Sequence, residues 1–279
     1  MRRGFIALFF NWKKFRKNPL SCAGLVIVLL LYCTAVFAPI LAREDPYQTN
    51  TENWLSSPDE QNWFGTDRLG RDVFSRVVHG SRISLAVGFV STALVILVGT
   101  ILGSLSGYYG GLLDTLIMRF TDVIMVFPTL FLIITLVLLF EPGILYIILV
   151  IGFVGWTSAA RLVRAEFITL REREYVQAAR ALGASDIRII FRHILPNAMS
   201  TIIVAATLSV PAAILAEAGL SFLGLGVPAP IPSWGNMLRE AQGYLRQAWW
   251  YAAFPGAFIF LTVMAFNLLG EGLRDSMDP

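Results

Sequence analysis

Cysteine is nearly absent from this sequence, and the positions of its two copies exclude the chemistry that cysteine usually supplies. Cys22 and Cys33 fall in one apolar segment, where a helical rise of 1.5 Å per residue places them about 16 Å apart. A disulfide requires two Cα atoms within about 7 Å, so these residues cannot pair without breaking the helix. The sequence therefore has neither a disulfide framework nor a cysteine-based metal motif.

Lysine and histidine are also scarce. The three lysines, Lys13, Lys14 and Lys17, lie near the N-terminus and none follows a glycine, which excludes a Walker A phosphate loop. The two histidines, His79 and His193, fall in expected loops, which excludes a His-Glu-x-x-His metal helix and leaves no evident catalytic base. We therefore expect that this chain is not an enzyme, holds no metal and binds no cofactor of its own.

Charged residues make up only 15% of the 279 residues, whereas hydrophobic residues make up 56% and the mean hydropathy is +0.66. No soluble core of this size needs so much apolar sequence, so we expect an all-α integral membrane protein. Six apolar segments are long enough to cross a bilayer, namely 20–41, 83–108, 116–140, 144–164, 202–225 and 250–269.

The distribution of basic residues predicts the orientation of these spans. Residues 1–19 carry six Lys or Arg and no acid, and the apolar run that follows is too long for a signal-peptide core. With six spans both termini lie on one side, and a cytoplasmic placement puts 15 of the 22 Lys and Arg residues inside. The expected organisation is a cytoplasmic or interfacial tail at 1–19 and one transmembrane domain at 20–279. That domain has an external loop at 43–82 and a cytoplasmic loop at 165–200.

A polar, arginine-rich stretch, residues 174–196, separates the fourth and fifth spans. Tyr175, Ala178, Ala179 and Leu182 recur at i, i+3, i+4 and i+7, so they share one face of a helix. Gly183 is expected to end that helix, because glycine adopts the left-handed conformation without a Cβ clash. Small residues on such a face let a partner approach closely, as a helix laid into a groove requires. The alternative is an amphipathic loop helix lying on lipid headgroups.

This stretch resembles the cytoplasmic coupling loop of ABC-importer permeases, the binding-protein-dependent transport family. The family motif reads Glu-Ala-Ala, three residues, Gly, nine residues, Ile, one residue, Leu-Pro. The positions in register here are Gln177, Ala178, Ala179, Gly183, Leu195 and Pro196. Gln177 stands where the motif has Glu, and His193 stands where it has Ile. Glu174 lies one turn before Gln177, on nearly the same face.

The external loop carries a second and more specific resemblance. Locally, residues 65–67 and 70–72 have the composition of turns with Asx-type caps, and a helix with a valine face is expected to begin near Asp72. The pattern resembles the C-type subunit of dipeptide, oligopeptide and nickel permeases. The matching positions are Gly65, Thr66, Asp67, Gly70, Arg71, Asp72, Ser75, Arg76, Gly80, Arg82, Ser84 and Leu85.

Residues 62–82 are expected to cap the outer mouth and to form part of the surface on which a solute-binding protein lands. The alternative is that the Asp and Arg residues pair internally and hold the loop against the helix ends. Residues 220–226, Leu-Ser-Phe-Leu-Gly-Leu-Gly, are also similar to this family. The resemblance therefore covers almost the whole chain after the first span.

Two acids are expected at membrane depth, where a carboxylate normally faces a protein interior or an aqueous path. Asp122 lies within one turn of Arg119, which favours a local ion pair. Glu217 has no basic residue within a turn and is a candidate for lining the translocation path, with a buried structural carboxyl as the alternative. In the second span, glycines recur every fourth residue and predict close packing of another helix; they are Gly99, Gly103, Gly107 and Gly111.

The resemblance implies a transmembrane subunit of an ATP-driven importer for peptides or a related small solute, in the cytoplasmic membrane of a prokaryote. It also implies four kinds of partner: a homologous sister permease, two ATPase subunits that bind ATP and Mg²⁺, an extracytoplasmic solute-binding protein, and the lipid bilayer. No nucleic acid is expected as a partner. The alternative function is an ATP-independent secondary transporter or channel, in which Asp122 and Glu217 would carry a coupling ion.

Overall fold

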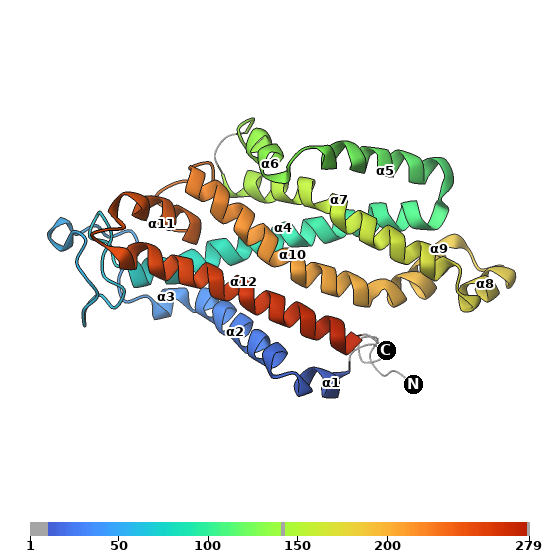
Figure 1. Ribbon diagram of the computed structural model, residues 1–279, viewed down its shortest axis with the longest axis horizontal. Coiled ribbons are helices and arrows are strands. Elements are labelled where there is room, and N and C mark those ends of the chain that lie inside the picture. Colours follow the sequence, from blue (N-terminus) through green and yellow to red (C-terminus); the bar gives the residue numbers. More distant parts are fainter. Residues whose placement is uncertain (1–10, 141–142, 278–279) are drawn as a thin grey trace.

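The computed structural model describes residues 11–140 and 143–277. These residues form an α-helical membrane protein without a β-strand, as the sequence predicts. Figure 1 shows an elongated bundle in which the long helices run along the longest axis. The helices are α1 (Trp12–Lys17), α2 (Pro19–Val36), α3 (Ala38–Leu41), α4 (Val73–Tyr109), α5 (Gly111–Val126), α6 (Thr129–Val137), α7 (Ile144–Arg171), α8 (Glu174–Ala181), α9 (Asp186–Ile189), α10 (Leu195–Leu223), α11 (Trp234–Ala241) and α12 (Trp249–Met277).

Five of these segments are long and apolar enough to cross a membrane alone, and α5 with α6 forms a sixth only if the pair is counted as one bent span. The two helices of this pair are inclined to each other by 88°. The predicted span over 116–140 corresponds to this bent pair, and the bend was not predicted from the sequence. Pro128 explains the break, because it lacks an N–H and its ring forces the preceding Phe127 into the extended conformation, with φ −84° and ψ 136°.

The helix predicted to begin near Asp72 is continuous with the second span, predicted at 83–108. Helix α4 starts at Val73, directly after the N-cap Asp72, and continues for 37 residues to Tyr109. At 1.5 Å per residue it is about 55 Å long, well beyond the roughly 30 Å hydrocarbon core. Its outer turns therefore project from the bilayer and carry the external loop. Neither histidine lies in a loop as expected, since His79 is on α4 and His193 is in a π-helical turn, Ile190–Ile194.

Helix α4 packs along α7 through the predicted glycine ridge. A Cβ at Gly103 would lie 2.5 Å from the Ala160 carbonyl oxygen, and one at Gly107 would lie 2.7 Å from that of Arg164. Only glycine lets the two backbones approach so closely. The fourth predicted member, Gly111, is not part of this contact: it has φ +57° at the turn into α5, and nothing lies within 4 Å of where its Cβ would be.

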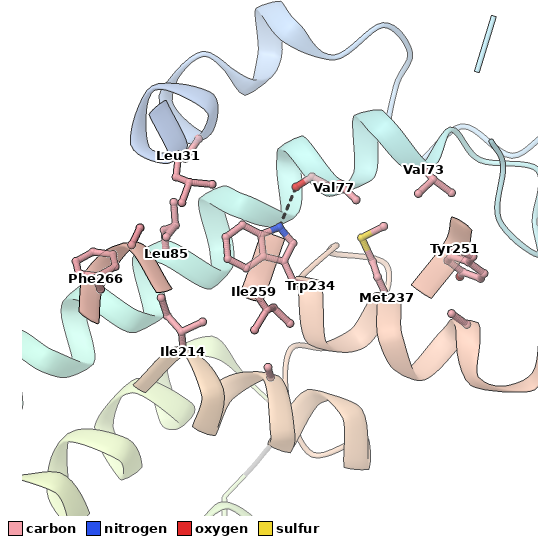
Figure 2. Packing of buried hydrophobic residues seen from close by; sticks show 14 of the residues in the cluster. Leu31, Val73, Val77, Leu85, Ile214, Trp234, Met237, Tyr251, Ile259 and Phe266 are labelled. Carbon is pink, nitrogen blue, oxygen red and sulfur yellow. Dashed lines mark hydrogen bonds between the residues drawn. The ribbon is translucent and has the colours of Figure 1, made fainter. Parts of the chain in front are cut away.

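A second core joins α2, α4, α10, α11 and α12 around Trp234, whose side chain is fully buried. Figure 2 shows the indole pointing into this cluster with Ile259 below it, while its ring nitrogen donates a hydrogen bond to the Val77 carbonyl oxygen at 3.1 Å. Buried Trp residues usually satisfy their N–H in this way. The short helix α11 is thereby held against the outer part of α4, at the end of the bundle that carries the external loop (Figure 1).

Candidate functional site

The segment between α7 and α10 forms a short helix with one anchored side. Helix α8 begins at Glu174, and Val176 is fully buried in a cluster with Tyr108 and Phe167. The helix ends at Ala181, and the predicted terminating residue, Gly183, follows its cap in the left-handed conformation with φ +78°. The Gly183 N–H donates to the Arg180 carbonyl at 2.9 Å, and the next N–H, that of Ala184, donates to the Ala179 carbonyl at 3.1 Å. This pair of bonds is a Schellman motif, which satisfies the last carbonyls of the helix.

The other side of α8 is open. Leu182 is 88% exposed and Tyr175 is 42% exposed, and Ala178 and Gly183 are exposed beside them. Ala179 is only half-buried and lies at the edge of this face, because its direction on the helix is closer to that of the buried Val176. We call Tyr175, Ala178, Leu182 and Gly183 the coupling face. Partial burial raises the pKa of the Tyr175 hydroxyl above its ordinary value.

Two further apolar residues of this segment are missing from the sequence prediction. Ile187 is 69% exposed and Phe191 is 65% exposed, and they lie four residues apart, so both point to one side of the helical stretch that follows α8. Their spacing of four residues would have predicted a shared apolar face, but the sequence prediction followed the positions of the family motif, which does not include them. Both residues lie at the start of the candidate span Asp186–Leu223, and large apolar side chains exposed together are typical of a surface that another protein or the membrane covers.

Polar contacts tie this segment to α4 and α7. The Tyr108 hydroxyl, on the last turn of α4, donates to Asp186 Oδ1 at 2.6 Å, and the Arg180 guanidinium lies 5.8 Å from the centre of the Tyr108 ring. Gln177 Nε2 donates to the Arg171 carbonyl at 3.1 Å, where α7 ends. The coupling face is therefore fixed to the second span as well as to the fourth.

Two of the predicted docking residues, Leu195 and Pro196, are withdrawn from the surface, whereas a third, Gln177, is exposed and also has a structural contact. The side chain of Gln177 caps α7, Leu195 is half-buried and Pro196 is buried. A π-helical turn over Ile190–Ile194 precedes Pro196 and changes the pattern of backbone hydrogen bonds there. Pro196 itself has no N–H to donate to such a bond. Glu174 is exposed in the first turn of α8, where its charge complements the helix dipole.

The external loop has the predicted turns at its centre. Asp67 Oδ1 accepts hydrogen bonds from the N–H groups of Leu69 at 2.7 Å and Arg71 at 3.0 Å, which is an Asx-type turn. Gly70 has φ +69°, and any side chain there would clash with the Asn50 carbonyl. Asp72 caps α4 by accepting from the Ser75 N–H at 2.8 Å. Gly65 also has φ +69°, and Thr66 is buried beside it.

A buried charge cluster links this loop to α11 and α12. Asp67 Oδ2 lies 2.6 Å from Arg71 Nε and 3.4 Å from Arg76 Nε, and Glu240 Oε2 lies 2.8 Å from Arg71 Nη2. The Tyr251 hydroxyl donates to the same Glu240 oxygen at 2.6 Å. Burial opposes the charge on Arg71, but Asp67 and Glu240 more than offset this and raise the pKa of Arg71 above its ordinary value.

The burial of this cluster supports internal pairing for the predicted loop motif. Thr66, Asp67, Arg71 and Asp72 are all buried, so a landing surface for another protein cannot be made of their side chains. Sequence reasoning missed Glu240, the acid that completes the cluster, because it lies 169 residues after Arg71 and carries no motif of its own.

The two acids expected at membrane depth have different surroundings. Glu217 is fully buried and accepts hydrogen bonds from Ser221 Oγ at 2.7 Å and Ser84 Oγ at 3.2 Å, which favours a structural carboxyl over a path-lining one. Ser84 Oγ also accepts from the Trp234 N–H at 3.2 Å, so the group joins α4, α10 and α11.

Asp122 is 47% exposed and forms two ion pairs. The predicted contact with Arg119 is long, at 3.9 Å, whereas Arg161 Nη2 of α7 lies 2.6 Å away. This shorter contact crosses between helices, which a local sequence pattern does not show. In the described ranges, no three His, Cys, Asp or Glu side chains converge as metal ligands would.

Comparison with known proteins identifies the family. Residues 99–279 match the family described as binding-protein-dependent transport system inner membrane component, and residues 10–58 match the N-terminal transmembrane domain of oligopeptide transport permease C. The chain is 44% identical over 268 residues to the dipeptide transport system permease protein DppC of Alkalihalophilus pseudofirmus, covering 96% of this chain and 88% of the relative.

Two more relatives agree over a similar length. The chain is 44% identical over 272 residues to the oligopeptide transport system permease protein OppC of Bacillus subtilis, and 43% identical over 272 residues to the glutathione transport system permease protein GsiD of Escherichia coli. Both matches cover 96% of this chain and 89% of the relative. The chain therefore belongs to the binding-protein-dependent transport family, as a multi-pass permease subunit of an ABC-type importer in the bacterial inner membrane.

Proposed function

We propose that this permease forms half of the pathway through which a di- or oligopeptide, or a related small solute such as glutathione, enters the cell. The names of the relatives at 43–44% identity support this class of cargo, since they transport dipeptides, oligopeptides and glutathione. The resemblance to this branch of permeases implies that the binding protein largely sets selectivity. The other half of the pathway is a homologous sister permease, which contributes its own copy of the single transmembrane domain.

The coupling face carries the proposal for ATP-driven transport. Tyr175, Ala178, Leu182 and Gly183 are exposed on a helix whose opposite side is anchored by Val176. A rigid helix with small and apolar exposed residues fits a groove on a partner protein. We assign that groove to one of two ATPase subunits, which bind ATP and Mg²⁺ and hydrolyse ATP in place of this chain.

The position of the coupling face supports a cytoplasmic location for it and for both termini. Figure 1 shows α8, α9, α1 and the C-terminal end of α12 in one half of the molecule, and α11 with the external loop at the opposite end. The half with α8 holds the basic residues of α1, which contains four Lys or Arg and no acid. A concentration of basic residues marks the cytoplasmic side of a membrane protein.

Motion passes from the ATPase to the pore through α4 and α7. Tyr108 and Gln177 join the coupling segment to these two helices, and the glycine contacts between α4 and α7 leave little space for them to slide. Closure of the ATPases would therefore move α4 and α7 as one body, which is the rigid rocking that alternating access requires.

At the outer end, exposed aromatic side chains of the loop replace the buried motif as the landing surface for the binding protein. Tyr47 is 46% exposed, Trp54 is 53% exposed and Trp63 is 54% exposed. The guanidinium of Arg43 lies 4.5 Å from the centre of the Trp63 ring and holds that ring in place. Rigid Tyr and Trp side chains are enriched where proteins bind one another.

Substitution of Ala178 by Trp tests the proposal at the coupling face. Ala178 is exposed, so the added ring leaves the fold intact and blocks only the groove of a partner. We expect the variant to insert and to assemble with the sister permease, but to lose the ATPase subunits on purification or to hydrolyse ATP without uptake. Ala178→Ser, which stays small, is the matched control and should retain uptake.

Full uptake by the Ala178→Trp variant with a normal complement of ATPase would show that the docking face is misassigned. Uptake by the wild-type chain in vesicles without ATP, together with purification free of any nucleotide-binding subunit, would instead support the ATP-independent transporter. A test at Ala179 would be less clear, because that residue is half-buried at the edge of the face.

A further inference from the structure

The buried carboxyl of Glu217 has no part in the transport cycle proposed above. It lies six residues before Leu223, the last residue of α10, and its side chain is fully withdrawn from solvent. No ion pair of residues 11–140 and 143–277 includes it. A buried acid at membrane depth costs free energy that an apolar side chain of similar size does not. Packing alone therefore does not account for an acid at this position.

Glu217 is the common acceptor for two serine hydroxyls on different helices. Ser221 Oγ of α10 donates to Glu217 Oε1 at 2.7 Å, and Ser84 Oγ of α4 donates to Oε2 at 3.2 Å. In turn, Ser221 Oγ accepts from the Val227 N–H at 3.1 Å. Ser84 Oγ accepts from the Trp234 N–H at 3.2 Å. A serine has one proton to donate, so the carboxyl attracts both protons and leaves both serine oxygens facing those backbone N–H groups.

The chain that follows α10 lies directly on this group. A Cβ at Gly226 would lie 1.9 Å from Ser221 Oγ, and one at Gly235 would lie 2.6 Å from the Ala218 Cα. Only glycine lets the backbone approach so closely at these two positions. The start of α11 is therefore held against α10 by close packing as well as by hydrogen bonds.

Helix α11 is also bound to α4 near both of its ends. At its start, Trp234 donates its backbone N–H to Ser84 and its indole N–H to the Val77 carbonyl at 3.1 Å (Figure 2). Near its end, Glu240 Oε2 lies 3.4 Å from Arg76 Nη2. The contacts meet α4 in reverse order, so α11 runs antiparallel to the outer turns of α4. A displacement of α11 therefore moves α4 with it.

Helix α4 also reaches the coupling segment. It is 37 residues long, and Tyr108 in its last turn donates a hydrogen bond to Asp186. It thus connects the end of the molecule where α11 lies with the half that holds the coupling face (Figure 1). Coupling between distant sites travels through such chains of packed and hydrogen-bonded elements. The tightness of the contact between α11 and α4 therefore decides how much of a displacement at the outer end reaches the coupling segment.

We propose that Glu217 is a positioning residue for transport. Through Ser84 and Ser221 it holds α11 against α4 and α10, so that docking of the binding protein at the outer end is passed to the ATPases. Its side chain is fully buried, so it acts through α11 and contacts neither the solute nor a partner. This role rests on the proposed function, since it needs an ATP-driven importer that a binding protein stimulates.

Glu217→Met tests this role in the whole transporter, reconstituted in proteoliposomes with its sister permease and ATPases. Methionine is unbranched and similar in length, but its thioether is only a weak hydrogen-bond acceptor. The binding protein, carrying the solute that it retains on purification, is titrated while ATP hydrolysis is measured. We expect the maximal stimulation to fall about fivefold, as the loss of one hydrogen bond implies. The half-maximal concentration of binding protein and the unstimulated rate should stay unchanged.

Glu217→Gln is the matched control. Its carbonyl accepts from one serine and its amide donates to a free lone pair of the other, so the three helices stay joined. We expect its maximal stimulation to stay within about twofold of the wild type. Equal loss in the Gln and Met variants would contradict the proposal. A lower Tm of the Met variant, with stimulated and unstimulated hydrolysis reduced in the same proportion, would overturn it in favour of a purely structural role.

Two buried serines of α4 separate this contact from the general effect of removing a hydroxyl. Ser84→Ala should reduce the maximal stimulation about fivefold, with no further loss when it is combined with Glu217→Met. Ser91 lies seven residues later on the same face, and its buried hydroxyl has no hydrogen-bond partner among the described residues. Ser91→Ala should therefore keep normal stimulation, and equal loss in the two serine variants would overturn the proposal.

The same experiment distinguishes failure of this role from failure of the proposed function. Normal stimulation of the Glu217→Met variant by the binding protein would overturn the role of Glu217 alone. Uptake by the wild-type transporter without ATP or a binding protein would overturn the proposed function, and the role of Glu217 with it.

Discussion

At the outer end of the molecule, Asp67, Arg71 and Glu240 are paired and largely withdrawn from solvent, whereas at the coupling end Leu182 and Phe191 are apolar and exposed. In a self-contained protein, charged side chains are expected to be exposed and apolar side chains to be buried. Burying a charge costs free energy, and leaving an apolar side chain exposed loses the stabilisation that its burial would provide. Each end therefore departs from the rule, but in a different direction.

The difference indicates where each end finds its partners. The outer charges have their partners within the chain, so they hold the external loop on α4, α11 and α12. The apolar residues of the coupling end have no such cover within the described residues, which agrees with the proposal that a partner protein covers them. The sequence left docking or internal pairing open for the loop motif, and docking or lipid contact open for the coupling segment. The burial of the loop charges favours internal pairing at the outer end.

This comparison predicts that substitutions at the outer end act on stability, while those at the coupling end act on transport. Replacement of Arg71 by Ala should have the largest effect, because it leaves the buried Asp67 without its closest cation and Glu240 with Arg76 as its remaining cation. Loss of one partner from a buried ion pair costs about 3–5 kcal/mol of folding free energy. We expect poor expression and a lower Tm of the purified permease.

Arg68 is the control for this prediction, since it lies in the same loop but is exposed. Arg68→Ala should change the stability by less than about 0.5 kcal/mol. The contrary result is that both variants are equally stable and that Arg71→Ala loses only the stimulation of ATPase activity by the binding protein. The motif would then be a docking site, and both ends of the molecule would act through partner proteins.

Replacement of Gly183 by Val is expected to have the next largest effect. Valine at φ +78° costs about 1–2 kcal/mol, because its branched Cβ crowds the backbone in the left-handed region. Nothing lies within 4 Å of where the Cβ would be, so the cost is in the backbone alone. We expect assembly with the sister permease but impaired coupling of ATP hydrolysis to uptake.

Asn adopts the left-handed conformation more readily than Val, so Gly183→Asn is the control, and it should recover most of the uptake. Equal loss in the two variants would mean that bulk at the interface, and not the backbone turn, is responsible. Measurement of transported solute per ATP hydrolysed distinguishes these outcomes.

The Gly183 turn and the Asp72 cap were predictable because each depends on residues adjacent in the sequence. Glycine in the left-handed region needs only its neighbours' backbone, and an N-cap needs only the next three residues. The valine face after Asp72 was predictable for the same reason, and Val73, Val77 and Val78 are all buried. Five of the six spans were found from hydropathy alone, with errors at their ends.

The features that the sequence did not predict depend on distant residues or on the choice between two local signals. Glu240 pairs with Arg71 across 169 positions, and Asp122 pairs with Arg161 across 39, and no local pattern encodes either contact. The break at Pro128 had a local signal, but the uninterrupted hydropathy of 116–140 was given more weight than the proline. Burial of the loop motif likewise depends on α11, which the motif does not contain.

A smaller effect is expected when the link between α4 and the coupling segment is cut. Tyr108→Phe keeps the buried ring and removes only the hydroxyl that donates to Asp186 at 2.6 Å, at a cost of about 1 kcal/mol. The proposed path through α4 predicts normal ATPase binding with fewer solute molecules transported per ATP. Asp186→Asn, which can still accept this bond, should be closer to the wild type, and normal coupling in Tyr108→Phe would remove α4 from the path.

The smallest effect is expected at Asp122, which lies between the two ends. A substitution there tests whether a charge at membrane depth acts on stability, as at the outer end, or on transport, as at the coupling end. Its carboxylate is 47% exposed, and its closest cation, Arg161, is 45% exposed. Half-exposed ion pairs contribute about 0.2–1 kcal/mol, since solvent screens them, so Asp122→Asn should change Tm little. If Asp122 serves only this pair, uptake should be unchanged in proteoliposomes at every pH tested, and Arg161→Gln should behave in the same way. Loss of uptake in Asp122→Asn, with Arg161→Gln unaffected, would instead place the carboxylate on the translocation path, because the two halves of a purely structural pair must give the same result.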